Sequence, residues 1–511
     1  ALEILRTRAF SMYFRRDSRI VDGLARRSFF EGVQAWGFLV LTNAIKLMIG
    51  VIMLMVPVRA ADRPNILFVL VDDLRFDDIA CAPGAPPFLK TPHIDRLARE
   101  GAMFTNAFVT TPLCSPSRAS FLTGLYAHHH GITDNTDRSP ATHRLNTFPL
   151  QLQRAGYETA FLGKWHMGND NTPRPGFSYW LCMKGQGQAT DPVVNENGRD
   201  IRLQGYVTDL LTEKTEALLR KKRDAPFAIY LSHKALHPNT RQASDGSTSP
   251  INGGGFIPAP RHRELYPLGD VEIPRRPNYG VPPLDKPILT RRIDDLPPLG
   301  HGTVIADQQI LDRLRMLAAV DEGLGRLLKV MEEVGQLDNT LIVLAGDNGF
   351  FYGEHGLYKE RRLAYEESIR MPLLMRYPAR IAAGSRPDRF ALNLDIAPTL
   401  LDFAGVPPSA PMDGRSLTPL FADGEAAWRK SFLIEYYTDT VFPRVRNMGY
   451  KAVRTERYKY IRYTDLAGMD ELYDLQVDPY ELRNIIKTAD GRAVLPELRT
   501  QLNRLVEHLS R

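Results

Sequence analysis

The sequence predicts an α/β fold with a large, mostly parallel sheet, followed by a smaller C-terminal α+β unit with an antiparallel sheet. Short apolar runs alternate with amphipathic helical segments from about residue 64 to residue 404, and the pattern changes after about residue 407. Hydrophobic residues make up 43% and charged residues 24% of the 511, which are ordinary globular values. They exclude a collagen, a long disordered chain and a polytopic membrane protein.

The predicted strands are short and apolar. The first, residues 67–71, is apolar on both faces and is followed by acids, which is typical of a buried parallel strand. Further strands are expected at residues 159–162, 227–232, 340–345 and 372–376 of the first unit, and at 431–437 and 450–463 of the second, where they look antiparallel.

The predicted helices are defined by apolar periodicity and by their ends. Thr91 is expected to cap a helix over residues 92–100 that has Pro92 at its first position. A long helical region over residues 306–334 is expected to break near Gly323 or Gly325. Further helices are expected at residues 148–155, 208–222, 394–404 and 495–510.

These elements divide the chain into three parts. Residues 1–60 form an N-terminal export segment, residues 61–406 the main α/β domain, and residues 407–511 the C-terminal α+β unit. Residues 239–302 are rich in Pro, Gly and Arg and are expected to form a loop-rich insertion. Long insertions without regular structure are often functional.

The first sixty residues have the pattern of a secretory signal. An apolar run over residues 47–58 follows Lys46 and ends in Val58-Arg59-Ala60, which has the small-x-Ala form of a cleavage site. Cleavage near Ala60 would make the protein secreted or periplasmic, whereas a retained segment would anchor it to a membrane; a mis-assigned start is a further alternative. Export would also permit Cys81 and Cys182 to pair.

Most of the net charge of +6 lies in this N-terminal segment. Residues 1–60 hold nine Lys and Arg and four acids, which leaves about +1 for the remaining chain. A nucleic-acid partner is therefore not expected, because such binders hold their basic excess in the folded domain. Three cysteines exclude a disulfide-stapled scaffold and a four-cysteine zinc site.

Two pairs of oxygen-bearing side chains follow predicted strands. Asp72 and Asp73 come directly after residues 67–71, and Asp347 and Asn348 follow residues 340–345. Acids in such places are often loop residues or helix caps, but ligand groups gather at the carboxyl ends of parallel strands. Hard oxygen ligands suit Ca²⁺ or Mg²⁺ better than zinc, so we expect a metal site here.

A cysteine stands at the start of another predicted helix, in the run Cys114-Ser-Pro-Ser-Arg118. The N-terminus of a helix favours an anion, and Arg118 would point its guanidinium at the same anion. A lone cysteine is more often an inert buried side chain, but the surrounding pattern reverses that interpretation.

Residues 114–124 resemble the signature of the type I sulfatase family, Cys-x-Pro-x-Arg with a trailing Thr-Gly. The resemblance extends over roughly residues 63–510, including Gly-Lys-Trp-His at 163–166 and Glu-Leu-Tyr-Asp-Leu at 471–475. It implies an alkaline-phosphatase-like sandwich. It also implies that Cys114 is converted to formylglycine by a formylglycine-generating or anaerobic sulfatase-maturing enzyme. One hydroxyl of the hydrated aldehyde would attack the sulfate ester, and the other would expel sulfate.

The resemblance also assigns roles to named residues. The metal is implied to be Ca²⁺, with Mg²⁺ second, held by Asp72, Asp73, Cys114, Asp347 and Asn348. Arg118, Lys164 and His166 match groups that contact sulfate and the diol. His237 matches the general acid that protonates the leaving alcohol, with His233 as a substrate-binding alternative. The family's sulfate-binding lysine aligns with Lys359 counted from Gly356, or with Arg361 counted from Tyr365.

The substrate is expected to be a sulfated carbohydrate. Residues 174–180, 184–187 and 354–357 resemble bacterial N-acetylglucosamine-6-sulfatases and mucin-desulfating enzymes. Iduronate 2-sulfate or another glycan sulfate is the nearest alternative. A phosphodiesterase or phosphonate hydrolase of the same superfamily, and a non-catalytic binder of sulfated glycans, are the alternatives from other classes.

Overall fold

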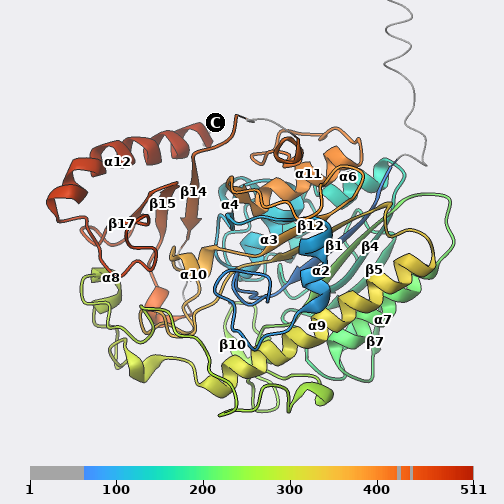
Figure 1. Cartoon of the computed structure of the whole chain (residues 1–511), viewed down its shortest axis with the longest axis horizontal. Coiled ribbons are helices and arrows are strands. Elements are labelled where there is room, and N and C mark those ends of the chain that lie inside the picture. Colours follow the sequence, from blue (N-terminus) through green and yellow to red (C-terminus); the bar gives the residue numbers. More distant parts are fainter. Residues whose placement is uncertain (1–62, 423–426, 438–440, 510–511) are drawn as a thin grey trace, which may run out of the picture. The chain divides into compact units, whose positions relative to one another are not determined.

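The computed structural model describes residues 63–509, apart from 423–426 and 438–440. The expected export segment therefore lies outside the described residues. The described residues form one compact unit, which contains both the α/β part and the C-terminal sheet (Figure 1). The expected division near residue 407 falls inside this unit and stays a prediction. Within the described part of the chain, no helix is both long enough and apolar enough to cross a membrane.

Nine strands form the central sheet, in the order β2-β12-β11-β1-β8-β4-β5-β6-β7. The five middle strands, from β11 to β5, run parallel, and the strands at both edges pair antiparallel with their neighbours. The predicted α/β fold is confirmed, with a mixed sheet. The strands are β1 (Asn65–Val71), β2 (Ala102–Met103), β4 (Glu158–Lys164), β5 (Tyr179–Met183), β6 (Val193–Glu196), β7 (Arg199–Arg202), β8 (Phe227–His233), β11 (Thr340–Gly346) and β12 (Leu373–Arg376).

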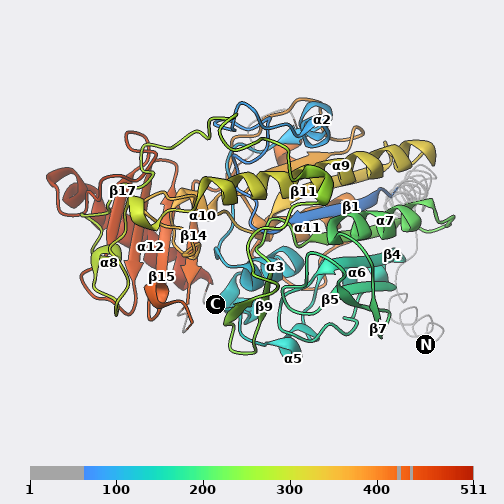
Figure 2. The ribbon, with the colours of Figure 1, turned by 90° about the horizontal axis from the view of Figure 1, so that it is seen from below.

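Helices cover both faces of this sheet, which explains why its central strands β1, β8 and β11 are buried along their whole length (Figure 2). In β1, Leu67 and Val69 face the layer of α2 (Pro92–Glu100), α7 (Val207–Arg220) and α9 (Asp307–Glu333). Ile66 and Phe68 face the opposite layer of α3 (Cys114–Thr123), α6 (Phe148–Arg154) and α11 (Ile396–Phe403). Alternate residues of one strand thus belong to two hydrophobic cores.

The helix α9 is continuous, so the expected break near Gly323 or Gly325 is wrong. A Cβ at Gly323 would lie 2.5 Å from Thr212 Oγ1 of α7, and a Cβ at Gly325 would lie 2.5 Å from His93 Nε2 of α2. The two glycines therefore allow neighbouring helices to approach α9 closely. They serve packing, and they do not interrupt the helix.

The expected cap of α2 is also different. The Thr91 hydroxyl makes no capping bond and instead donates to Asp95 Oδ1 and accepts from the backbone N–H of Ala80. The free N–H groups of the first helical turn are bound by Asp321 of α9, whose Oδ1 accepts from His93 at 3.1 Å and from Ile94 at 2.8 Å. A carboxylate from a distant helix takes the place that a local side chain usually fills.

The C-terminal sheet has four antiparallel strands in the order β14-β15-β16-β17, and α12 packs on it. The predicted strand over residues 450–463 is a hairpin of two strands, and α12 begins six residues earlier than expected. Apolar side chains of this sheet share a hydrophobic core with Phe108, Leu113 and Tyr365 of the α/β part. The elements are β14 (Ser431–Tyr436), β15 (Tyr450–Thr455), β16 (Tyr458–Tyr463), β17 (Glu471–Asp474) and α12 (Ala489–Leu509).

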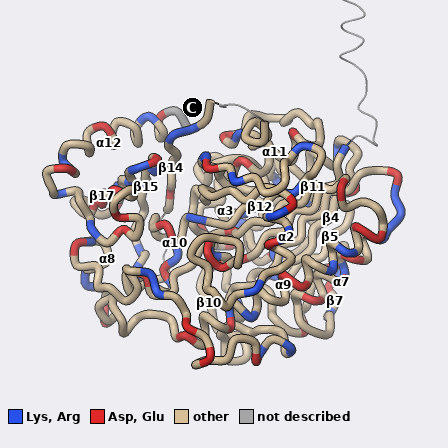
Figure 3. Tube along the Cα trace, viewed as in Figure 1, with Lys and Arg blue, Asp and Glu red and all other residues tan. Residues whose placement is uncertain are grey.

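Residues 239–302 contain only short elements and otherwise irregular chain, as expected for a loop-rich insertion. Basic and acidic residues are interspersed over the described part of the chain (Figure 3). The remaining short elements are β3 (Ala107–Phe108), α4 (Ala127–His130), α5 (Ser139–Thr142), β9 (Thr240–Gln242), β10 (Thr248–Pro250), α8 (Pro287–Thr290), α10 (Glu366–Ile369) and β13 (Ala391–Leu392).

Candidate active site

The carboxyl ends of four adjacent parallel strands, β11, β1, β8 and β4, form the floor of the candidate site. Val71, the last residue of β1, pairs in register with Gly346 of β11 and with His233 of β8. Asp72 and Asp347 therefore leave neighbouring strands side by side. The two predicted oxygen pairs meet at one edge of the sheet, as their positions after the strands indicated.

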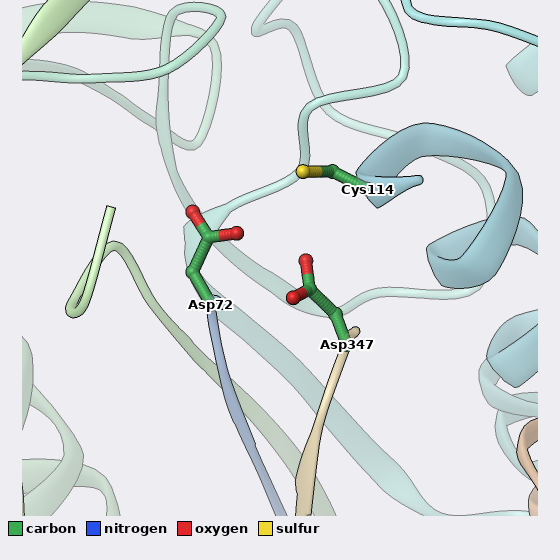
Figure 4. Close-up of side chains that lie close together, drawn as sticks. All are labelled: Asp72, Cys114 and Asp347. Atoms are coloured by element: carbon green, nitrogen blue, oxygen red, sulfur yellow. The ribbon is translucent and has the colours of Figure 1, made fainter. Parts of the chain in front are cut away.

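Cys114 enters this place from the first residue of α3. Its sulfur and carboxylate oxygens of Asp72 and Asp347 all lie within 4.8 Å of one another, and the three side chains point toward a common centre (Figure 4). All three are fully buried. Burial and the nearby carboxylates raise the pKa of the Cys114 thiol to about 12, although Lys164 opposes this shift.

Three buried oxygens of the cluster have no hydrogen-bond partner among the residues that the structure describes. They are Asp72 Oδ1, Asp73 Oδ2 and Asn348 Oδ1. The other oxygen of Asp73 accepts from Asn348 Nδ2 at 2.8 Å, and Asp347 Oδ1 accepts from the backbone N–H of Asp73 at 2.8 Å. Buried oxygens without partners are costly unless a ligand binds them, so this donor set fits a hard divalent cation.

Arg118 and Lys164 face the carboxylates of Asp72 and Asp347. Arg118, one helical turn after Cys114, places Nη2 2.8 Å from Asp347 Oδ2 and 3.5 Å from Asp72 Oδ1. Its Nη1 donates to the Lys164 carbonyl at 2.7 Å and to Ser232 Oγ at 2.6 Å. Lys164 Nζ donates to Asp72 Oδ2. Although burial raises it, the pKa of Asp72 is held well below its usual range by Lys164 and Arg118.

His166 lies beside this cluster at the end of β4, in a left-handed backbone conformation with φ 54°. Its Nε2 is 2.5 Å from Gln242 Oε1 and 2.8 Å from Gln186 Nε2. Gln242 Nε2 in turn donates to the carbonyl of Asn135 at 2.7 Å. The imidazole is therefore oriented by two amides, one of them from the loop-rich insertion.

The two candidate histidines after β8 occupy different places. His237 is buried beside the cluster, and its Nδ1 lies 2.9 Å from the Pro238 carbonyl, which can only accept. His233 continues the face of β8 that packs on α7; burial lowers its pKa to about 4, and the only charge that counters this shift is that of Asp209 of α7. The structure thus brings His237 to the cluster and leaves His233 outside it.

The two alternatives for the family's sulfate-binding lysine are also separated. Arg361 Nε lies 2.9 Å from Asp73 Oδ1, and although burial lowers its pKa, Asp73 and Cys114 raise it above its usual range. Lys359 is exposed and its ammonium lies 5.7 Å from the ring centre of Tyr358. Arg361 joins the cluster, whereas Lys359 lines an adjoining cavity of about 570 Å³ together with His237 and Arg361.

Some residues of the site were not predicted. Ser232 carries a signal, because it ends a predicted strand. Gln186 and Gln242 carry none, since they lie 20 and 76 residues from His166 and an amide has no motif of its own. Cys81 and Cys182, which an oxidising compartment could have paired, are both free thiols.

Comparison with known proteins fixes the family. The Sulfatase family model matches residues 64–406, about two thirds of the chain. The chain belongs to the sulfatase family. A second model, described as N-sulphoglucosamine sulphohydrolase, C-terminal, matches residues 353–508 of this sulfatase. The sulfatase is therefore a sulfuric ester hydrolase, as its signature predicted.

Individual relatives agree with this assignment. The sulfatase is 33% identical to an N-acetylglucosamine-6-O-sulfatase of Bacteroides thetaiotaomicron, over 87% of this chain and 86% of that protein. It is 29% identical to the human N-acetylglucosamine-6-sulfatase, over 86% of this chain and 83% of that protein. The solved structure of BT4656 in complex with its substrate D-glucosamine-2-N,6-O-disulfate superposes with a TM-score of 0.74 at 32% identity, covering 88% of this chain and 98% of that chain.

Proposed function

We propose that this sulfatase removes sulfate from carbohydrates, with 6-O-sulfated N-acetylglucosamine as its preferred group, at Cys114 converted to formylglycine and beside a bound Ca²⁺. Sulfated N-acetylglucosamine is supported by the relative that is 33% identical over most of both chains. The site is supported by one observation above others: Cys114, Asp72 and Asp347 converge within 4.8 Å in a buried cluster.

The cation would be held by Asp72, Asp73, Asp347 and Asn348. Three of these side chains contribute a buried oxygen that accepts no hydrogen bond from the described residues. Because all the donors are hard oxygens on the ends of two strands, Ca²⁺ fits best and Mg²⁺ second. When bound, such an ion lowers the pKa of hydroxyls beside it and offsets charge on sulfate oxygens.

The chain's own residues supply the rest of the chemistry. Arg118 and Lys164 place positive charge next to position 114, where a sulfate dianion would bind. His237 would protonate the leaving alcohol: since its Nδ1–H must face the Pro238 carbonyl, Nε2 is the atom left to carry the transferred proton. Arg361 would bind the same sulfate from the side of Asp73.

The maturation and export of the protein are part of the proposal. A formylglycine-generating or anaerobic sulfatase-maturing enzyme would modify Cys114, and cleavage near Ala60 would release the mature chain outside the cytoplasm. The mass of the peptide across Cys114 tests the first, because the aldehyde replaces sulfur by oxygen and removes two hydrogens. N-terminal sequencing of the exported protein tests the second.

A panel of defined sulfated sugars, assayed with mature enzyme and calcium, tests the substrate. We expect the highest kcat/KM on N-acetylglucosamine 6-sulfate and its N-sulfated analogue, and a lower value on iduronate 2-sulfate. The same preparation should hydrolyse 4-nitrophenyl sulfate faster than 4-nitrophenyl phosphate or phosphonate esters. A preference for the phosphorus esters would overturn the proposed function.

A further inference from the structure

The cavity beside the catalytic cluster has two kinds of wall. On its inner side lie His237 and Arg361, which reach the cluster. The lining also includes aromatic and charged side chains from three separate segments: Phe256 of the insertion, residues 350 and 358–362, and residues 442–444. A volume of about 570 Å³ is in the range of small-molecule sites, and aromatic rings offer apolar faces to a sugar ring.

The charges of this lining are unbalanced. Among the lining residues that the structure describes there are four cations and one acid, Glu360. That acid is already engaged, because Glu360 Oε2 accepts from the N–H groups of Tyr358 at 3.2 Å and Lys359 at 2.9 Å. Its Oε1 lies 3.5 Å from Arg444 Nε.

Lys359 differs from the other cations of the lining. Arg361 pairs with Asp73, Arg444 pairs with Glu360, and Arg362 packs its guanidinium 3.9 Å from the ring centre of Phe442. Lys359 has no carboxylate within 4.0 Å in the part of the chain that the structure describes, and its side chain is exposed at the cavity. It therefore presents a positive charge that no described side chain neutralises.

We propose that Lys359 is a specificity residue that favours sugars carrying a second anionic group besides the sulfate that is removed. The inference rests on the proposed function, since it assumes that the 6-sulfated sugar occupies this cavity. The second group is either an N-sulfate on the same sugar or the carboxylate of a neighbouring uronate. An ammonium is a compact point charge on a flexible stem, so it can accept either group without bidentate geometry.

Solvent limits the contribution that the Lys359 charge can make to kcat/KM, because the ammonium is exposed. A charge pair at an exposed rim is worth up to about 1 kcal/mol, which is a change of about fivefold in kcat/KM. Such a pair is weakened by salt because mobile ions screen exposed charges. We therefore expect the preference for doubly anionic sugars to weaken as the ionic strength rises.

The test compares four mature, calcium-loaded enzymes: wild type, Lys359→Gln, Lys359→Arg and Lys222→Gln. Lys222 is an exposed lysine five residues before β8, near the amino ends of the parallel strands, whereas the site lies at their carboxyl ends. Its substitution controls for the loss of one positive charge. The substrates are N-acetylglucosamine 6-sulfate, glucosamine 2-N,6-O-disulfate and a 6-sulfated disaccharide with a uronate. The measured quantity is the ratio of kcat/KM on each doubly anionic substrate to kcat/KM on the first.

We expect Lys359→Gln to lower this ratio by about fivefold on at least one doubly anionic substrate, Lys359→Arg to retain it, and Lys222→Gln to leave it as in the wild type. The substrate on which the ratio falls identifies the source of the anion. An unchanged ratio in Lys359→Gln on both substrates overturns the inference alone. If the wild type hydrolyses none of the 6-sulfated sugars but hydrolyses other sulfate esters, the proposed function fails and the inference fails with it.

Discussion

Both carboxylate oxygens of Asp347 accept hydrogen bonds from other residues of the site. Its Oδ1 accepts from the backbone N–H of Asp73, and its Oδ2 accepts from Arg118 Nε at 2.9 Å. One carboxylate thus holds the backbone of the loop after β1 and also orients the Arg118 guanidinium. Removal of this side chain therefore acts together on the proposed cation site and on Arg118, the proposed sulfate-binding arginine.

We predict that Asp347→Ala lowers kcat/KM on 4-nitrophenyl sulfate by about 100-fold or more, because preorganised charge at the reacting centre is lost. Asp347→Asn keeps the shape of the side chain and should lose a similar amount, since it lacks the charge. Circular dichroism checks that both variants fold, and Asp270→Ala, at an exposed aspartate of the insertion, is the matched control. Activity near the wild-type level in Asp347→Ala would contradict the assignment of the site.

Gln242 is a residue without a sequence signal that orients His166, a candidate site residue. It reaches His166 from β9 of the insertion, and it is buried whereas its neighbour Arg241 is exposed. We predict that Gln242→Ala lowers kcat by about tenfold through loss of this orientation. Arg241→Ala should stay close to the wild type. Equal kinetics in the two variants would show that the hydrogen bond to His166 has no part in turnover.

Among the elements, α9 connects the helices that cover one face of the sheet. It packs on α2 and α7, and its two glycines lie where these helices come closest. Thr212 of α7 has little freedom to move away, because its hydroxyl donates to the Thr208 carbonyl. His93 of α2 is half-buried and presents only the end of its ring to Gly325.

Because Thr212 is held in place and the His93 ring is not, replacing Gly323 or Gly325 by alanine should change stability differently. In Gly323→Ala, the steric conflict with Thr212 outweighs the gain in helix propensity, so we predict that the free energy of unfolding falls by about 1–3 kcal/mol. In Gly325→Ala the His93 ring can rotate, so stability should stay equal or rise by up to about 1 kcal/mol. Denaturant unfolding of both variants measures the contrast, and equal destabilisation would argue against this packing.

The elements also show what sequence patterns can and cannot predict. Helices and strands with long apolar periodicity, such as α7 and β11, were predicted within a few residues, because burial alone determines their pattern. The break in α9 and the Thr91 cap were predicted wrongly, because a glycine or threonine has the same local propensity whatever helix packs on it. Only the tertiary positions of Thr212 and Asp321 decide these cases.

The same limit applies to the candidate site. Asp72, Asp347 and Cys114 could be predicted to converge, because strand ends meet at one edge of a parallel sheet and the motif is long. The choice between Lys359 and Arg361 could not be made, since an irregular loop has no period that says which side chain turns inward. Gln242 depends on the path of an insertion, which composition alone does not define.

At the scale of the whole described unit, buried polar groups tie the C-terminal sheet to the α/β part. Lys459 of β16 is buried, with Nζ 3.1 Å from Glu366 Oε1 and 2.5 Å from Glu481 Oε1. Glu471 of β17 accepts from the hydroxyls of Tyr365 at 2.8 Å and Tyr473 at 2.7 Å. Burial raises the pKa of Glu471 to about 7, although these hydroxyls oppose the shift.

This shift predicts a pH-dependent stability. The pKa of Glu471 is near 4.5 when unfolded and about 7 when folded, so the protonated group contributes its full stability below pH 4.5. That contribution is lost as the pH rises to about 7, by on the order of 3 kcal/mol. Glu471→Gln should therefore have a higher Tm than the wild type at pH 8, with a difference that shrinks toward pH 4.5.

Thermal unfolding of both proteins between pH 4.5 and 8 measures this difference. Glu507→Gln, at an exposed glutamate of α12, should follow the wild type at every pH. A Tm difference that does not vary with pH would show that the Glu471 carboxyl does not titrate in this range.

The connection between β14 and β15 supplies Phe442, Pro443 and Arg444 to the cavity beside the catalytic cluster. The strands that lead to Asp72 and Asp347 and the residues 442–444 that line this cavity thus come from distant parts of the chain, and both sheets contribute to the surroundings of the cluster. On the proposed function, exchanging residues 442–444 between family members is expected to change sugar preference while Cys114, Asp72 and Asp347 stay in place. An enzyme shortened before β14 would lose these lining residues. It would also lose the C-terminal sheet, whose apolar side chains share a hydrophobic core with the α/β part.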